Sequence, residues 1–209
     1  MWPRIIVGKS GYNLGVRRAA ARCVEWAKTA LGAASESELE AKAAALGLAA
    51  RAAAPVFLPY RGGERTPHND AVLRGSFHGI SHSADQAAMA YAVIEGVTFG
   101  LTDGLNALKA AGSSVSRLSL VGGGARSAFW AQQLASSLGV EIVTHAESAA
   151  GGALGAARLG WLADGGTPAQ VCTQPAITHS YRPDPAEQAF LAPRYARFQA
   201  LYPALKTLQ

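Results

Sequence analysis

Residues 118–127 read LSLVGGGARS, an apolar strand pattern that runs into three consecutive glycines and then toward a helix. Glycine has no Cβ, so a ligand can lie close to such a backbone, and the first amides of a helix lack intrahelical acceptors and bind anions. The stretch predicts a nucleotide-binding turn; a tight turn without a ligand is the structural alternative. The candidate cofactor-binding residues are Gly122, Gly123, Gly124, Ala125, Arg126 and Ser127.

The segments around this turn alternate between helix and strand patterns. Apolar residues recur every three or four positions up to Gly112, and Ser83 with Gln86 has capping-box spacing, which predicts one long helix stopped by a glycine. A strand at 115–121, a helix at 127–138, a strand at 140–144 and a helix at 151–163 are expected to follow. Such alternation predicts an α/β fold with a largely parallel, helix-covered sheet.

The remaining chain is less regular. A helical stripe from residue 19 to Gly32 and a second helix over 35–54, opened by Ser35 and Glu38, precede an apolar stretch at 55–60 and a polar loop at 61–70. An amphipathic helix that docks on the body is expected at the C-terminal end. Residues 1–18 show no clear period, so we predict an atypical segment at 1–18 and one partial domain at 19–209.

Composition narrows the class of protein. The 209 residues are 49% hydrophobic and 16% charged, which is typical of a globular chain, and no run of 18 apolar residues predicts a membrane span. Cys23 and Cys172 are too few for a disulfide framework, and no signal peptide pattern opens the chain, so a cytoplasmic location is expected. The net charge of +5 is spread along the sequence, which argues against a nucleic-acid partner.

Two other phosphate-binding motifs fit the sequence poorly. Gly8-Lys9-Ser10 resembles the end of a P-loop, but Pro3 stands where that motif requires glycine. The turn at 122–127 also departs from the dinucleotide fingerprint, because Ser127 replaces the last glycine and no acidic residue follows a second strand at the usual distance. A dehydrogenase remains a minor alternative.

No residue is assigned a catalytic or metal-binding role. His78 and His82 have the spacing of metal ligands on a helix, but Gly79 and the loop-like sequence favour polar loop histidines. Ser127 has no histidine placed to act as its base, and its position suits a helix cap. Trp130 and Leu134 are expected in the core.

Five motifs, taken in order, resemble the FGGY family of carbohydrate kinases. They are PYRGGERTPH at 59–68, RGSFHG at 74–79, EG at 95–96, GGGARS at 122–127 and ALGAA at 153–157. Each motif is weak alone, but their combination over residues 20–205 is specific. The resemblance implies the C-terminal domain of the actin-like ATPase, or ribonuclease H-like, fold. It also implies ATP as substrate with Mg²⁺, and transfer of the γ-phosphate to the 5-hydroxyl of D-xylulose. Glu64 and Arg65 would then belong to a site wall or an interdomain contact, or equally to a solvated loop.

The sequence also departs from this family. Members are more than twice as long and use an aspartate in an earlier glycine-rich turn as general base, whereas this sequence has no aspartate before Asp70 and no carboxylate before Glu25. Gly152 stands where the family usually has proline, and Ala149 where it has an acid. We therefore expect a C-terminal fragment of a sugar kinase that is inactive alone, partnered by a complementing N-terminal half or a second copy. A non-catalytic nucleotide-binding module, or one subunit of a split kinase, is the alternative.

Overall fold

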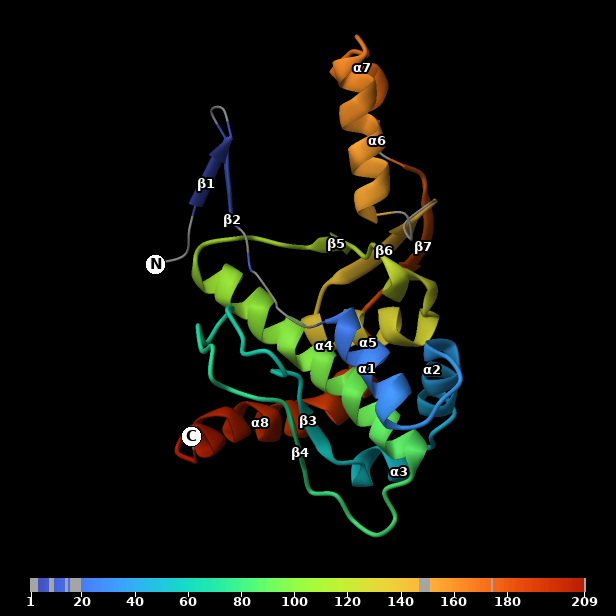
Figure 1. Ribbon diagram of the computed structural model, residues 1–209, viewed down its shortest axis with the longest axis vertical. Coiled ribbons are helices and arrows are strands. Elements are labelled where there is room, and N and C mark those ends of the chain that lie inside the picture. The colour runs from blue at the N-terminus through green and yellow to red at the C-terminus, as the bar shows by residue number, and fades with distance from the viewer. Residues whose placement is uncertain are drawn as a thin grey trace.

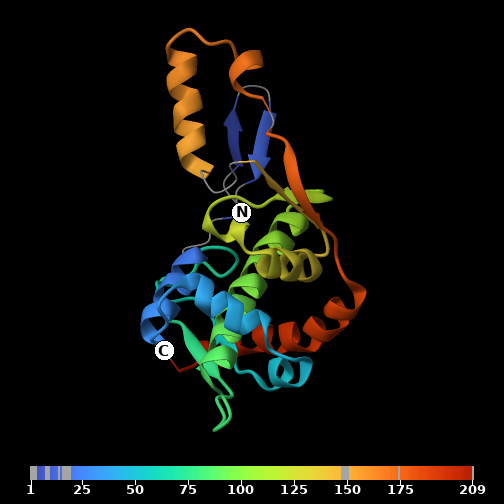
Figure 2. The same cartoon turned by 90° about the vertical axis from the view of Figure 1, so that its right-hand side faces the viewer.

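The computed structural model describes residues 4–7, 10–13, 15, 20–146, 151–173 and 175–208. The body is built around one long helix, α4 (Gln86–Ala110), with shorter helices and small sheets packed along it (Figure 1). Two helices, α6 (Gly151–Ala163) and α7 (Pro168–Val171), project from one end of this body (Figure 2). The α/β class and the bounds predicted for α6 agree with the structure.

The sheets are smaller than the alternation predicts. Antiparallel pairs join β1 (Arg4–Val7) to β2 (Ser10–Asn13), and β3 (Val56–Leu58) to β4 (Ser76–His78). The third sheet has the order β5 (Arg117–Ser119), β6 (Glu141–His145), β7 (Ile177–Tyr181). Its β5 and β6 are parallel as expected, but β7, which was not predicted, is antiparallel to β6. After β6 the chain runs out through α6 and α7 and then returns from them, so β7 runs in the opposite direction to β6 (Figure 2).

In the described part of the chain, three helices precede β3. The first is α1 (Ala21–Ala30), and the single helix expected over 35–54 is divided into α2 (Glu36–Ala44) and α3 (Leu48–Ala53), with Gly47 as the N-cap of α3. Ser35 caps α2 as predicted, because its Oγ accepts from the Glu38 amide at 3.1 Å. The Glu38 carboxylate accepts from the Ala34 amide, one residue earlier than in a strict capping box.

The start of α4 differs from the prediction. The capping box of Ser83 and Gln86 is wrong, because Asp85 is the N-cap and its Oδ1 accepts from the Ala88 amide at 2.8 Å. Gln86 instead reaches across to α1, where its Nε2 donates to the Leu31 carbonyl at 2.6 Å. The end of α4 is as expected, since Gly112 has a φ of +93°, a conformation that glycine adopts without strain.

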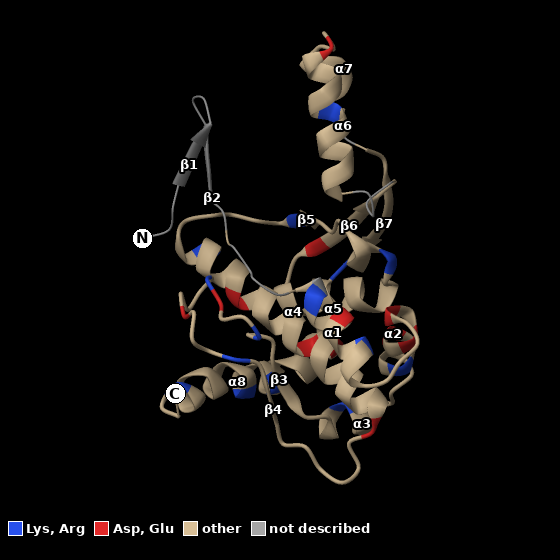
Figure 3. Cartoon of the chain, in the orientation of Figure 1, with Lys and Arg blue, Asp and Glu red and all other residues tan. Residues whose placement is uncertain are grey.

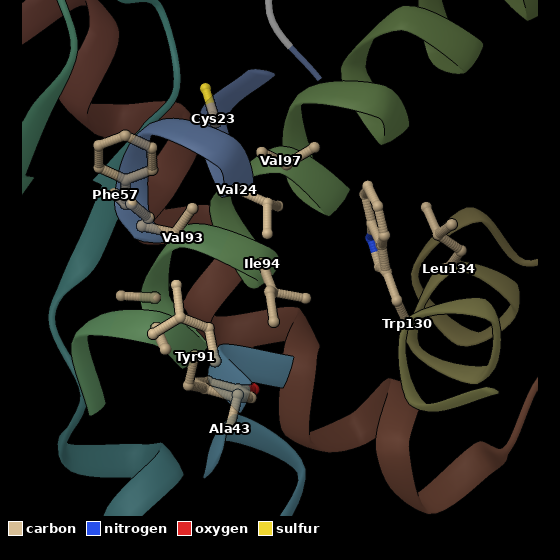
Figure 4. Packing of buried hydrophobic residues seen from close by; sticks show 14 of the residues in the cluster. Cys23, Val24, Ala43, Phe57, Tyr91, Val93, Ile94, Val97, Trp130 and Leu134 are labelled. Carbon is tan, nitrogen blue, oxygen red and sulfur yellow. The ribbon is translucent and has the colours of Figure 1, made fainter. Parts of the chain in front are cut away.

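The main core lies between α4 and its neighbours. Figure 4 shows Val93, Ile94 and Val97 of α4 between α1 and β3 on one side and Trp130 and Leu134 of α5 (Ala128–Leu138) on the other. Burying each such side chain stabilises the fold by about 1.5–3 kcal/mol. The prediction that Trp130 and Leu134 are core residues is confirmed.

Helix α8 (Pro185–Lys206) closes the body as a docked C-terminal helix, as predicted. Its Leu191, Phe198 and Leu201 form a second cluster with residues of β3 and α4. Lys and Arg are distributed over several elements (Figure 3), in keeping with the scattered basic residues of the sequence. Among the described residues, none of the helices is both long and apolar enough to cross a membrane.

Candidate functional site

The glycine turn lies between β5 and α5 and contains a short 3-10 helix. Gly122 has a φ of +86°, and the 3-10 helix then runs over Gly123–Arg126 before Ser127 caps α5. The Ala125 amide donates to the Gly122 carbonyl and the Ser127 amide to the Gly124 carbonyl, both at 3.1 Å. The direct strand-to-helix turn expected from the sequence is therefore replaced by a tighter one, in which these two amides are already bonded.

The three glycines of the turn differ in backbone conformation and in the room that each leaves for a side chain. Gly122 adopts a backbone conformation that L side chains rarely adopt. A Cβ on Gly124 would lie 2.6 Å from Cζ3 of Trp130, so this glycine is required by packing. A Cβ on Gly123 would meet only Arg126 Nη2, at an ordinary contact distance of 3.6 Å. The packing around Gly123 thus leaves room for a side chain, and the open space beside it is available to a ligand.

Ser127 joins the turn to α2. Its Oγ accepts from the Trp130 amide at 3.2 Å, which confirms that it caps α5. The Ser127 side chain also interacts with the carboxyl of Glu40, where it acts to lower the pKa. Trp130, which follows the turn in α5, donates from Nε1 to Thr98 Oγ1 of α4 at 3.0 Å. The end of the turn therefore contacts α2 through Ser127, and α5 is bonded to α4 through Trp130.

A cavity of about 340 Å³ opens beside this turn. One wall comes from α1 and α2, and the other from the turn and the start of α5. Four of the six predicted residues line it, namely Gly123, Gly124, Arg126 and Ser127, whereas Gly122 and Ala125 do not. The α2 wall contributes Glu36, Ser37, Glu40, Ala41 and Ala44. The prediction missed this wall, because α2 and the turn are about 80 residues apart along the chain and only packing joins them.

The cavity carries charges of both signs. Burial raises the pKa of Glu40, and the nearby Glu36 charge acts in the same direction. The hydrogen bond from Ser127 and the charge of Arg126 act to lower it. The walls therefore place two carboxylates on α2 and one guanidinium on the turn around the same space.

The loop at 61–70 docks on α8. Glu64 is only 1% exposed, its backbone pairs with that of Asp70, and its Oε1 accepts from the Arg65 amide at 2.8 Å. The solvated-loop alternative is therefore wrong for Glu64. The His68 ring stacks on Tyr202 with ring centroids 3.6 Å apart. A smaller cavity of about 200 Å³ lies between this loop, α4 and α8.

The weaker motifs do not join the cavity. His78 lies on β4 and, like His82, is exposed, so the pair does not share a helix. Gly8 and Lys9 of the P-loop-like motif, and Ala149 where the family has an acid, lie outside the described residues. Within the part of the chain that the structure describes, no three His, Cys, Asp or Glu side chains gather where they could hold a metal ion. Cys23 and Cys172 are not joined by a disulfide.

Comparison with known proteins identifies the family of this chain. Residues 6–163 match the C-terminal domain of the FGGY family of carbohydrate kinases, so the chain belongs to that family. It is 37% identical over 198 residues to a xylulose kinase of Escherichia coli, a match that covers 93% of this chain and 40% of that protein.

Solved structures agree with this assignment. A kinase from Brucella ovis, described as a xylulose kinase, matches with a TM-score of 0.78 and 41% identity, over 90% of this chain and 39% of that one. A gluconate kinase from Lactobacillus acidophilus matches with a TM-score of 0.78 and 28% identity, over 98% of this chain and 42% of that one. The chain thus has the fold of the C-terminal part of these actin-like kinases, and spans about 40% of the length of the relatives it matches.

Proposed function

We propose that this chain is the nucleotide-binding, C-terminal portion of a sugar kinase of the xylulokinase type. The reaction of the whole enzyme would be ATP plus D-xylulose to ADP plus D-xylulose 5-phosphate. The observation that carries the proposal is the room beside Gly123 in the wall of a cavity large enough for part of a nucleotide. The name shared by several relatives supports xylulose as the sugar.

In this proposal each residue of the turn has a distinct task. Gly122 and Ala125 shape the 3-10 turn, and Gly123 lets the nucleotide approach the backbone. Arg126 provides a positive charge for the phosphates, and Ser127 holds the start of α5. Mg²⁺ would arrive bound to the ATP phosphates, as is usual for kinases, since the described residues offer no cluster of ligands for it.

We further propose that this sequence does not catalyse transfer by itself. Its first aspartate, Asp70, is held in a local turn, where Oδ1 accepts from the amides of Val72 and Leu73, both at 3.0 Å. That geometry gives Asp70 a structural role instead of that of a general base. The base and most of the sugar contacts would come from a complementing half.

Two apolar surfaces favour such a complementing half over a free-standing module. Strand β5 is at the edge of its sheet, and an apolar cavity of about 240 Å³ lies beside it, lined by Leu101, Leu105 and Leu118 among others. Unpaired sheet edges and exposed apolar patches are sites of association. On α6, Leu159 is 69% and Trp161 55% exposed. A second copy of this chain is the alternative occupant. We also propose a cytoplasmic location, in keeping with two cysteines that are not joined by a disulfide.

Calorimetric titration with ADP tests the nucleotide site. Gly123→Val should abolish binding without unfolding the chain, because its Cβ meets no atom closer than 3.6 Å. Gly47→Val is the matched control, since Gly47 lies outside the cavity, has a φ of −67° and has nothing within 4 Å of a Cβ. Unchanged ADP affinity in Gly123→Val would place the site elsewhere.

A coupled assay for ADP release, with ATP and D-xylulose, tests the second part. The chain alone should give no sustained turnover, and addition of a polypeptide that carries the sugar-binding half of a xylulose kinase should restore it. Turnover by the chain alone would contradict the proposed lack of a base. ADP binding without restoration would favour a non-catalytic nucleotide-binding module.

A further inference from the structure

Glu40 stands at the centre of the α2 wall of the nucleotide cavity. Glu36 and Glu40 are four residues apart on α2 and therefore share one face of the helix, and both line the cavity. Glu40 is only half-buried, so its carboxylate is accessible from the cavity while it contacts the turn through Ser127.

Ser127 lies on the side of the turn that faces this carboxylate. Ser127 is itself held by capping α5 through its Oγ, and its side chain interacts with the carboxyl of Glu40. An ionised carboxylate has two oxygens with about four lone-pair sites, so one donor leaves capacity for another. Glu40 is thus a positioned acceptor in the wall of the cavity.

The charges of the two walls also orient a nucleotide. Phosphates would be repelled by Glu36 and Glu40 and attracted by Arg126 on the opposite wall. The part of the nucleotide that faces α2 must then be uncharged. In a nucleoside the uncharged donors are the ribose hydroxyls and the amino group of the base.

We propose that Glu40 is a specificity-determining residue that accepts a hydrogen bond from a neutral donor of the nucleoside, either a ribose hydroxyl or the base amino group. This inference rests on the proposed nucleotide site. The proposal gives Glu40 a role in binding the ligand, beyond its contact between α2 and α5.

Calorimetric titrations of the full chain with four ligands test this role. They are ADP, 2′-deoxy-ADP, 3′-deoxy-ADP and inosine diphosphate, which lacks the amino group of adenine. Glu40→Gln is the informative variant, because its neutral amide oxygen can still accept from Ser127. Glu25→Gln is the matched control, since Glu25 is exposed and lies outside the cavity. Circular dichroism and thermal melting verify that each variant is folded.

Glu40→Gln should bind ADP about 10-fold more weakly, because its amide has one acceptor oxygen in place of two and lacks the charge that strengthens a hydrogen bond. One of the three analogues should show a similar loss with the unaltered chain and little further loss with Glu40→Gln, which identifies the donor. Glu25→Gln should bind like the unaltered chain. Equal ADP affinity in Glu40→Gln and the unaltered chain would overturn the role of Glu40 and leave the nucleotide site standing. No binding of ADP by the unaltered chain would overturn both.

Discussion

Arg194 of α8 and Glu95 of α4 form a buried two-point ion pair. Arg194 Nε donates to Glu95 Oε1 at 2.6 Å and Nη2 donates to Oε2 at 2.7 Å, with the two residues 4% and 0% exposed. The same guanidinium donates to the carbonyls of Ala52 and Ala54. This one side chain therefore joins α8, α4 and the segment before β3.

Removing one partner of this pair should be costly. Arg194→Met leaves the Glu95 carboxylate buried without its guanidinium, and the expected loss is about 3–5 kcal/mol in the free energy of unfolding. Urea denaturation monitored by circular dichroism measures it. The double variant Glu95→Met/Arg194→Met should recover much of the loss, because no buried charge remains. A single variant that loses less than about 1 kcal/mol would show that the pair is solvated.

Two neighbouring glycines should respond differently to alanine. Gly124→Ala places a Cβ 2.6 Å from the Trp130 ring and should destabilise the chain by about 1–3 kcal/mol through overpacking. Gly123→Ala should leave the free energy of unfolding nearly unchanged, since its closest neighbour is 3.6 Å away. Thermal melts of both variants make the comparison. Equal stability losses would mean that Trp130 does not contact the turn in this way.

The cap of α4 provides a second matched pair. Asp85→Ala removes the acceptor for the Ala88 amide and should cost about 1 kcal/mol. Ser83→Ala should have little effect, because the Ser83 hydroxyl pairs with Ser81 and lies outside the helix. Urea denaturation of both variants measures the two changes in the free energy of unfolding. A larger loss of stability in Ser83→Ala than in Asp85→Ala would show that Ser83 caps the helix, as the sequence suggested.

Asp70 should contribute a pH-dependent part of the stability. Hydrogen bonds from the Leu73 and Val72 amides hold the pKa of Asp70 below its usual value of 3.8. A carboxyl with a lowered folded-state pKa stabilises the chain fully above the unfolded value and loses that contribution as pH falls through the folded value. The melting temperature of Asp70→Asn should therefore fall less steeply than that of the unaltered chain below about pH 4. The same change of melting temperature with pH in the two chains would contradict this prediction.

Local sequence patterns were enough to predict much of the chain. The bounds of α6, the Ser127 cap and the glycine that ends α4 depend on residues a few positions apart, where periodicity and capping chemistry act directly. The five motifs in order were enough to indicate the family. The break between α2 and α3 was missed, because alanine-rich sequence on both sides of Gly47 favours helix throughout.

The sequence by itself determined the family and which faces are apolar, since these are properties of neighbouring residues. Only the tertiary structure decided that Gly124 serves packing while Gly123 borders open space, that Glu40 faces Ser127, and that Glu95 pairs with Arg194. The physical reason is the distance along the chain. Glu40 and Ser127 are joined by the packing of α2 against α5, and Glu95 and Arg194 by the docking of α8 on α4, and no local pattern specifies either contact.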